Sequence, residues 1–156
     1  MKRLFILLVF IAPIHALSQN DTIEIRKVID IFFHSLKVGD SAQMATILHD
    51  NISLGTTFNT QAGVPAYQVE TKQELLDAVG TPHIELWNEK ISNVAIYCDD
   101  NLATAWMDYN FYLNDTFSHC GVNSFGFIKT EKGWMIISII DTRRKEPCEK
   151  AINENH

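Results

Sequence analysis

Residues typical of β-strands dominate the second half of the chain and predict four consecutive strands. Val, Ile, Thr, Tyr, Phe and Trp are frequent here, and short polar breaks with Asn, Asp or Gly separate the runs. The run at the end is apolar almost throughout, which predicts a strand that is buried on both faces. The four predicted strands are 84–98, 102–113, 117–130 and 134–142.

The first half of the chain has mainly helical periodicity. Asp21 can cap a helix to about Val38 that Gly39 ends, and Asp40 or Ser41 can begin a short second helix through Leu48. A capping-box pattern at Thr71–Glu74 begins a third helix, which ends at Gly80–Pro82. The apolar stripe of the first helix consists of Ile25, Val28, Ile29, Phe32, Phe33 and Leu36, and two shorter strands are predicted at 52–58 and 66–69.

Residues 1–18 have the pattern of a secretory signal peptide. Lys2-Arg3 is followed by the apolar run Leu4–Ile11, and small residues precede a cleavage point after Ser18. The run is far shorter than the roughly 20 residues of a membrane span. We therefore expect an exported protein, periplasmic or extracellular, with Gln19 as the mature N-terminus. An uncleaved membrane anchor is the alternative.

The remaining residues, 19–156, are expected to form a single domain. They number 138, which is the full 156 less the 18 of the signal peptide, and this length suits one hydrophobic core. Without Lys2 and Arg3, 11 basic residues stand against 19 acidic ones, a net charge of about −8 with histidine neutral. This balance argues against nucleic acid, and against an anionic membrane once the signal is cleaved, because both require a basic surface.

Several segments resemble the nuclear transport factor 2-like (NTF2-like, or SnoaL-like) superfamily, and in particular a group of secreted bacterial members. General matches are Leu36–Asp40, Asp100–Ala103 and Gly133–Ile136, and more distinctive ones are Tyr109–Asn114, Phe117–Gly121 and Asp141–Lys145. The resemblance implies an α+β fold, in which a curved antiparallel sheet forms a cone around about three helices of the N-terminal half and encloses a pocket. The superfamily includes isomerases, dehydratases, epoxide hydrolases, polyketide cyclases and non-catalytic binding or dimerisation modules, so the fold does not select a function.

The polar residues of the last three strands can be placed on faces if the turns are assumed. With a two-residue turn at Asn114-Asp115, Asn110 lies opposite His119 and Trp106 opposite Asn123. With a three-residue loop at 131–133, Asn123 also lies opposite Asp141. A one-residue error in either turn would move residues to the other face. The face predicted to line the pocket contains Trp106, Asp108, Asn110, Tyr112, His119, Asn123, Phe125, Asp141 and Arg143.

This face has the groups needed for proton transfer. His119 and Asp141 are the predicted acid and base, and Arg143 could bind a carboxylate or stabilise an anion. The alternative is structural: Asp141 and Arg143 form an ion pair, and His119 is a hydrogen-bonded core or rim residue. The remaining residues of the face, with Arg143, are the predicted ligand contacts: Trp106, Asp108, Asn110, Tyr112, Asn123, Phe125 and Arg143.

No metal or cofactor motif is present. His34, His49 and His83 do not recur at metal-ligand spacing, and the sequence has neither a phosphate-binding glycine loop nor a nucleophile elbow. Three cysteines allow at most one internal disulfide. The predicted register separates Cys98 from Cys120 by roughly 20 Å, whereas a chain reversal near Pro147 could bring Cys148 to Cys120. We therefore expect the pair Cys120–Cys148 and a free, buried Cys98.

The favoured interpretation is an exported domain that binds a small organic ligand in the cone pocket. A homodimer is also expected, because the last strands have apolar residues on both faces and a monomer would leave one face partly exposed. The first alternative is a cofactor-independent lyase or isomerase that uses His119 and Asp141, with dehydratase-like chemistry. The second alternative is a purely structural dimerisation or partner-binding module, which would have a filled cone. The sequence does not identify a ligand or a reaction.

Overall fold

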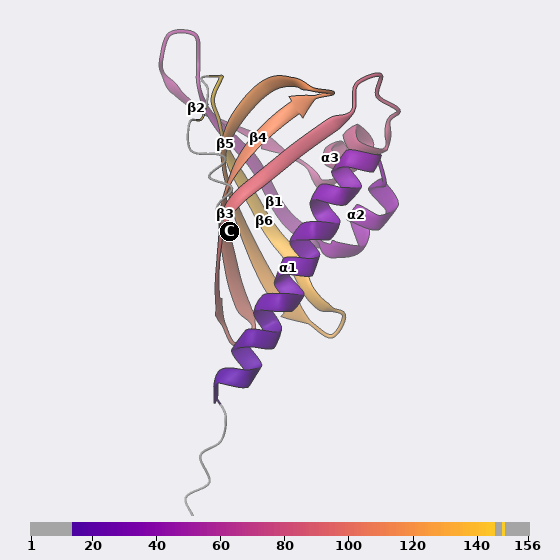
Figure 1. The fold of residues 1–156 in the computed structure, drawn as a ribbon, viewed down its shortest axis with the longest axis vertical. Coiled ribbons are helices and arrows are strands. Elements are labelled where there is room, and N and C mark those ends of the chain that lie inside the picture. Colours follow the sequence, from indigo (N-terminus) through magenta and orange to yellow (C-terminus); the bar gives the residue numbers. More distant parts are fainter. Residues whose placement is uncertain (1–13, 146–147, 149–156) are drawn as a thin grey trace, which may run out of the picture.

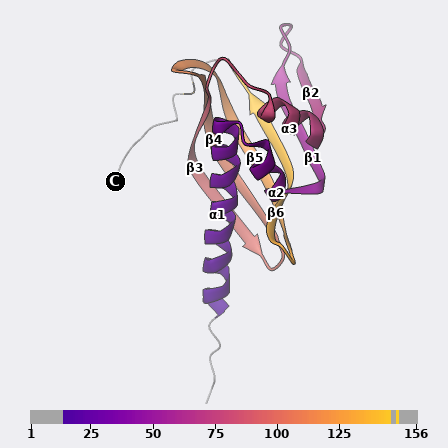
Figure 2. The ribbon, with the colours of Figure 1, turned by 90° about the vertical axis from the view of Figure 1, so that its right-hand side faces the viewer.

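A curved six-stranded sheet and three helices make up residues 14–145 and Cys148, the part of the chain that the computed structural model describes (Figure 1). The strand order is β2-β1-β6-β5-β4-β3. All three helices lie on the concave face of the sheet, as the side view shows (Figure 2). The predicted α+β cone is confirmed.

The helices begin and end at the residues that the sequence signals indicate, with one exception. α2 (Ser41–Ile47) is capped by Asp40, whose side chain accepts a hydrogen bond from Gln43, and α3 (Lys72–Gly80) begins with the predicted capping box of Thr71 and Glu74. Gly39 follows α1 with a φ of +74°, the left-handed conformation that glycine adopts easily. The exception is the start of α1 (Ile14–Val38), which lies ahead of Asp21.

The predicted signal peptide lies mostly outside the described residues, and it stays a prediction. Residues 14–18 of that segment continue α1, and residues 1–13 are not described. Within the described part of the chain, no helix is long and apolar enough to cross a membrane.

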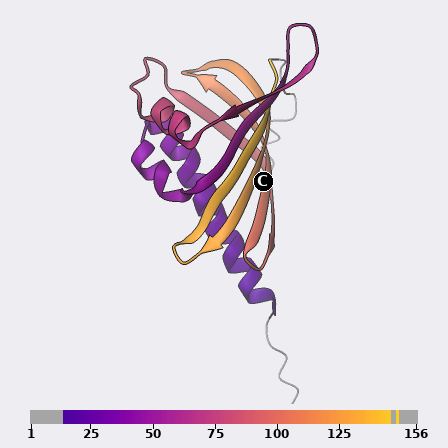
Figure 3. The same cartoon turned by 180° about the vertical axis from the view of Figure 1, so that it is seen from behind.

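The strands follow the predicted order, with one pairing that differs. β1 pairs with β6 in parallel, whereas every other neighbouring pair is antiparallel. The sheet is therefore mixed. Its parallel pair joins a strand from the first half of the chain, β1, to the last strand, β6 (Figure 3). The strands are β1 (Leu48–Asn59), β2 (Pro65–Glu70), β3 (Trp87–Asp99), β4 (Leu102–Leu113), β5 (Thr116–Thr130) and β6 (Gly133–Arg143).

The predicted register between β4 and β5 is wrong by one residue, although the predicted turn is correct. Leu113 pairs with Thr116 around the two-residue turn, and Tyr112 pairs with Phe117. Beyond this point Ser118 is an extra residue, so that His119 pairs with Phe111 instead of Asn110. This β-bulge exchanges the two faces of β4 relative to the rest of β5.

A second bulge, between β5 and β6, restores the predicted register instead of changing it. The turn contains two residues instead of the predicted three, because Thr130 pairs with Gly133. Ile137 is then an extra residue between the pairs Phe127–Ile136 and Gly126–Ser138. The short turn and the bulge cancel, and Asn123 pairs with Asp141 as predicted.

The core lies between α1 and the concave face of the sheet. Phe32 of α1 packs edge-on against Phe125 of β5, with ring centroids 5.2 Å apart. At the other end of α1, Asp21 accepts hydrogen bonds from Lys129 (2.6 Å) and from the Trp134 indole (3.1 Å). Both bonds lower the pKa of Asp21, and the bond from Lys129 has the larger effect. The fully buried large side chains include Tyr109, Phe125, Phe127, Ile25, Ile29, Met44, Leu48, Met107 and Ile136.

Candidate functional site

A cavity of about 580 Å³ lies between the sheet, α1 and α3. Apolar residues of both helices and the sheet form most of its wall, and polar groups from β1, β2, β3, β5 and β6 point into the same space. The lining residues are Phe32, Leu36, Leu54, Gly55, Thr56, Phe58, Gln68, Glu70, Leu75, Ala78, Trp87, Glu89, Tyr109, Phe111, Leu113, His119, Asn123, Ile139, Asp141 and Arg143.

Glu89 of β3 is the most perturbed carboxyl group in the cavity. Burial raises its pKa to about 7, and repulsion from Asp141 acts in the same direction. Asn123 of β5 partly offsets these effects by donating a hydrogen bond of 2.7 Å from Nδ2 to Glu89 Oε1. Glu89 therefore changes protonation near neutral pH.

Sequence reasoning missed Glu89, although a signal was present. Trp87, Glu89 and Ile91 occupy alternate positions of β3, and the two flanking side chains are apolar and partly buried. A charged residue at an inward position between two apolar ones indicates a buried polar group that needs a partner.

Asp141 of β6 is held by hydroxyl groups from two other strands. Its Oδ1 accepts a hydrogen bond of 2.5 Å from Thr56, and the Tyr109 hydroxyl lies 3.0 Å from its Oδ2. The same hydroxyl lies 3.0 Å from the Thr142 carbonyl oxygen. Arg143 approaches Oδ2 at 3.8 Å, and its side chain is 52% exposed at the cavity mouth. Burial and the nearby Asp141 carboxylate raise the pKa of Tyr109, which stays a neutral donor.

His119 lies against aromatic rings on the cavity wall. Its ring stacks on Phe111 with centroids 4.8 Å apart and meets Tyr109 edge-on at 5.8 Å. Ser118 Oγ lies 3.0 Å from His119 Nδ1. Burial lowers the pKa of His119 to about 4, and repulsion from Arg143 contributes. The imidazole is therefore neutral at physiological pH.

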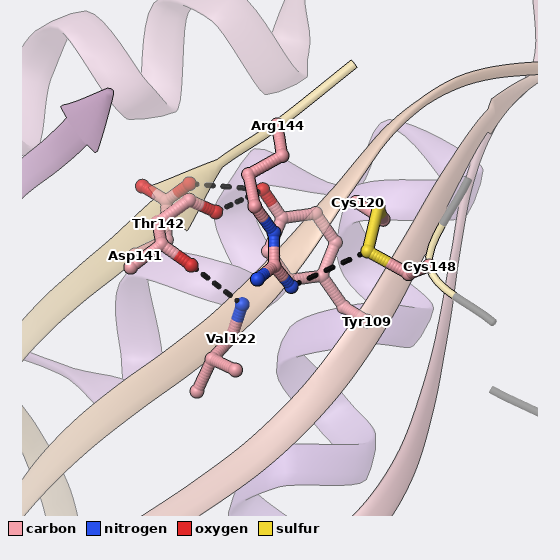
Figure 4. Close-up of a disulfide and its surroundings, with 7 residues drawn as sticks. All are labelled: Tyr109, Cys120, Val122, Asp141, Thr142, Arg144 and Cys148. Atoms are coloured by element: carbon pink, nitrogen blue, oxygen red, sulfur yellow. Dashed lines mark hydrogen bonds between the residues drawn. A yellow bond between two sulfur atoms is a disulfide. The ribbon is translucent and has the colours of Figure 1, made fainter. Parts of the chain in front are cut away.

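A disulfide lies directly behind the polar side chains, on the other face of β5. Cys120 is bonded to Cys148, the pair expected from the sequence (Figure 4). Cys98 is free, as expected, but only partly buried. Arg144 and Cys120 exchange two backbone hydrogen bonds of 2.9 Å each, which extend the pairing of β6 with β5 beyond Arg143. The disulfide therefore attaches Cys148 to the strand that carries His119 and Asn123.

Gly121 allows the strands to approach closely at this point. A Cβ atom on Gly121 would lie 1.7 Å from the Thr142 carbonyl oxygen, far inside contact distance. That oxygen is one of the two acceptors of the Tyr109 hydroxyl, and Thr142 Oγ1 also accepts a hydrogen bond from the Val122 amide (Figure 4). The glycine of the Cys120-Gly121 pair thus makes room for the contacts that position Asp141.

The structure separates the predicted site residues into three groups. His119, Asn123, Asp141 and Arg143 line the cavity. Phe125 is on the same face but packs in the core against Phe32 and Phe33. The predicted face is wrong for β4, because the Ser118 bulge turns its even-numbered residues to the outer face. The outward-facing residues are Trp106, Asp108, Asn110 and Tyr112. The cavity is lined instead by Tyr109, Phe111 and Leu113 of the same strand.

The outer-face residues have other contacts. Asp108 accepts a hydrogen bond from Asn93 at 2.8 Å, Lys90 lies over the Tyr112 ring at 4.9 Å, and Trp106 is 55% exposed. Within residues 14–145 and Cys148, no three His, Cys, Asp or Glu side chains are grouped as metal ligands. The side chains that line the cavity supply hydrogen-bonding groups, charges and titratable groups.

No protein-family model and no curated protein matches the sequence, but many solved structures match the fold. An NTF2-like protein with a cystatin-like fold from Novosphingobium aromaticivorans has a TM-score of 0.65 at 13% identity over 85% of this chain and 88% of its own. An NTF2-like protein of unknown function from Shewanella baltica has a TM-score of 0.60 at 15% identity over 82% and 97%.

A proposed dehydratase of the NTF2-like family from Streptomyces avermitilis also matches, with a TM-score of 0.60 at 12% identity over 82% of this chain and 99% of its own. At these identities the likeness shows a shared fold. In each of the three comparisons it extends over at least four-fifths of both chains.

Proposed function

On this NTF2-like fold, we propose that the chain is an exported domain that binds a small organic ligand in the cavity between the sheet, α1 and α3. The main observation in support of ligand binding is the cavity itself. Its volume of about 580 Å³ lies within the roughly 300–1,000 Å³ of ligand pockets. Apolar walls with a few converging polar groups are typical of such pockets, because the walls supply affinity and the polar groups fix orientation.

The ligand is oriented by the polar end of the cavity. Glu89, Asn123 and Asp141 come from three strands and are linked to one another or to neighbours by hydrogen bonds. Their positions are therefore set before a ligand arrives, which reduces the entropy lost on binding. The aromatic rings of Trp87 and Phe111 lie beside them, with centroids 6.1 Å apart.

Export and a homodimer complete the proposal. The signal-peptide pattern and the Cys120–Cys148 disulfide support an oxidising compartment, periplasmic or extracellular. An apolar patch on the outer face of the sheet, consisting of Tyr97, Leu102, Trp106 and Ile140, supports self-association. Tyr97 lies on β3, Leu102 and Trp106 on β4 and Ile140 on β6, and Trp106 and Ile140 flank Ser124 of β5 in one cross-strand row.

A cofactor-independent lyase or isomerase is the second candidate, and the pKa of Glu89 favours it. A carboxyl group with a pKa of about 7 can take up and release a proton at neutral pH. His119 is less suited to this role than the sequence indicated, because a pKa of about 4 makes its imidazole a weak base and leaves no imidazolium to act as an acid at neutral pH. Both oxygens of Asp141 already accept hydrogen bonds. In this candidate function Glu89 transfers the proton, while Asp141 and His119 hold the substrate beside it.

A purely structural module agrees less well with the observations. That function predicts a filled cone, whereas the cone contains an open cavity lined by polar groups with perturbed pKa values. A structural protein gains nothing from a partly buried carboxyl group that lies in a cavity.

Native mass spectrometry of unreduced protein from the exported fraction tests the binding function. We expect a reproducible small adduct on the mature chain that begins at Gln19. Ala78 lines the cavity, so Ala78→Phe fills it and should abolish the adduct. Ala42→Phe is the matched control, because Ala42 is exposed on α2. An adduct that survives Ala78→Phe in a folded protein would place the ligand elsewhere and contradict the proposal.

A further inference from the structure

The charges that line the cavity are unequal. Three carboxyl groups, those of Glu70, Glu89 and Asp141, share the wall with one guanidinium group, that of Arg143. Arg143 already approaches Asp141 at 3.8 Å and is half exposed at the mouth. His119 adds no positive charge at neutral pH, because burial lowers its pKa to about 4. The interior of the cavity therefore has an excess of negative charge when Glu89 is ionised.

Glu89 has only part of the stabilisation that an ionised carboxylate needs. Asn123 donates to its Oε1, and no described residue donates to its Oε2. No lysine or arginine within residues 14–145 forms an ion pair with it. A partly buried carboxylate without a counter-charge is unfavourable, and a cationic partner removes the penalty.

Two aromatic residues lie next to Glu89 on the cavity wall. Trp87 precedes Glu89 by two residues and shares its face of β3, and Phe111 is the cross-strand partner of Glu89 on β4. The Phe111 ring stacks in turn on His119. Aromatic faces attract cations through their quadrupole, most strongly where water is excluded. Carboxylates with aromatic walls are thus complementary to a cation that carries apolar groups.

We propose that the ligand is a small organic cation, an amine with an apolar body, whose ammonium group binds Glu89 while its body contacts Trp87 and Phe111. The inference rests on the proposed binding function and names its ligand class. Asp141 has a supporting role, because its carboxylate adds to the negative potential and its own oxygens are occupied by Thr56 and Tyr109.

Proton linkage follows from this arrangement. The groups that interact with the Glu89 carboxyl group are Asn123 of β5, Tyr109 of β4, and Asp141 and Arg143 of β6. His119 of β5 and Glu70 of β2 line the same cavity. An ammonium group binds the ionised form of Glu89, so binding releases the proton that Glu89 carries below a pH of about 7. The affinity for an amine therefore rises as the pH rises through this value.

Calorimetry with three matched probes tests the inference on the mature chain. Naphthylethylamine, naphthylethanol and naphthylpropanoate have similar bodies and carry a positive, a neutral and a negative end. At about pH 8, above the pKa of Glu89, we expect the amine to bind about tenfold more tightly than the alcohol, as one charge-assisted hydrogen bond provides. Glu89→Gln should remove this difference, and Glu85→Gln, an exposed matched control, should keep it.

The outcomes separate the two proposals. Equal affinity for amine and alcohol, or tighter binding of the propanoate, would overturn the cation inference and leave the binding pocket in place. Binding of all three probes that is unchanged in Ala78→Phe would contradict the pocket itself, and so would the absence of binding by any probe. Two results together support both proposals. The preference for the amine at about pH 8 disappears in Glu89→Gln, and at about pH 6 the binding enthalpy of the amine varies with the ionisation enthalpy of the buffer, because binding there releases the proton of Glu89.

Discussion

Asn123 donates a hydrogen bond of 2.7 Å to Glu89, and this bond joins two strands that are not neighbours in the sheet. The amide is on β5 and the carboxyl group is on β3, with β4 between them. The sheet is curved (Figure 1), and both side chains line the cavity beside it. The contact holds a titratable carboxyl group inside the cavity. The effect of that group on the free energy of unfolding can be measured as a function of pH.

Glu89→Gln should stabilise the protein at high pH. The folded-state pKa of Glu89 is about 7, against 4.5 for a free carboxyl group. Between these values the folded state retains a proton that the unfolded state has released, so the free energy of unfolding falls as pH rises through this range. Glutamine removes this loss, which is at most about 3 kcal/mol above pH 7. Urea denaturation at about pH 5 and about pH 8 measures the effect, and Glu85→Gln should show no such difference.

His119→Gln should have the opposite pH dependence. The folded-state pKa of His119 is about 4, below its ordinary value of 6.5. As pH falls from about 6.5 to about 4, the unfolded state takes up a proton that the folded state excludes, and the wild-type protein loses stability. The glutamine variant avoids this loss, which we place at about 2 kcal/mol because the ring keeps some contact with solvent. Thermal unfolding of both proteins across this range checks it. A constant difference would contradict the buried environment of the ring.

The sequence predicted the elements well and the faces of the strands less well. Caps, turns and apolar stripes determine where a helix or strand begins, and they are local. The bulges at Ser118 and Ile137 have no comparable local signal, and each reverses which side chains point inward. His119, Asn123, Asp141 and Arg143 were placed together because the error at Ile137 was cancelled by the shorter turn. Trp106 and its neighbours on β4 were misplaced because nothing cancelled Ser118.

Gly121→Ala should be severely destabilising. The added methyl group would lie 1.7 Å from a backbone oxygen of Thr142, and backbone moves less easily than a side chain. We expect a loss of about 3 kcal/mol or more, or no folding. Gly126→Ala is the matched control on the same strand, because its methyl group would meet the Ser138 hydroxyl, the end of a side chain. Chemical denaturation should give a smaller loss for Gly126→Ala, and equal losses would contradict the close approach at Gly121.

Removal of the disulfide should destabilise the chain by about 3.6 kcal/mol, the loop-closure entropy expected for a separation of 28 residues. Cys148→Ala is the suitable variant, because it leaves the buried Cys120 side chain in place. Denaturation of oxidised protein measures the loss. Cys98→Ala serves as the control, since Cys98 is the free cysteine of the described residues. Three reactive thiols in unreduced, unfolded wild-type protein would contradict the Cys120–Cys148 bond.

Trp106→Lys should weaken self-association. Trp106 is 55% exposed in the apolar patch of the outer face, and a lysine there would place a charge in the proposed interface. We expect the dissociation constant of the dimer to rise by about tenfold or more, as measured by sedimentation equilibrium. Lys90→Ala, on the same face near Tyr112, is a control that should have a smaller effect. A monomeric wild-type protein would contradict the proposed dimer.

The parallel pairing of β1 with β6 has a consequence for the order of folding. β3 to β6 form a meander of neighbouring hairpins, whereas the Thr56–Asp141 contact joins residues 85 positions apart. Contacts between distant parts of a chain form more slowly than local ones, because a longer loop must close first. We expect the meander to form early and β1 to dock late. The carboxylate of Asp141 then acquires its Thr56 partner only in that last step, and the cavity wall is complete only when the two halves of the chain have met.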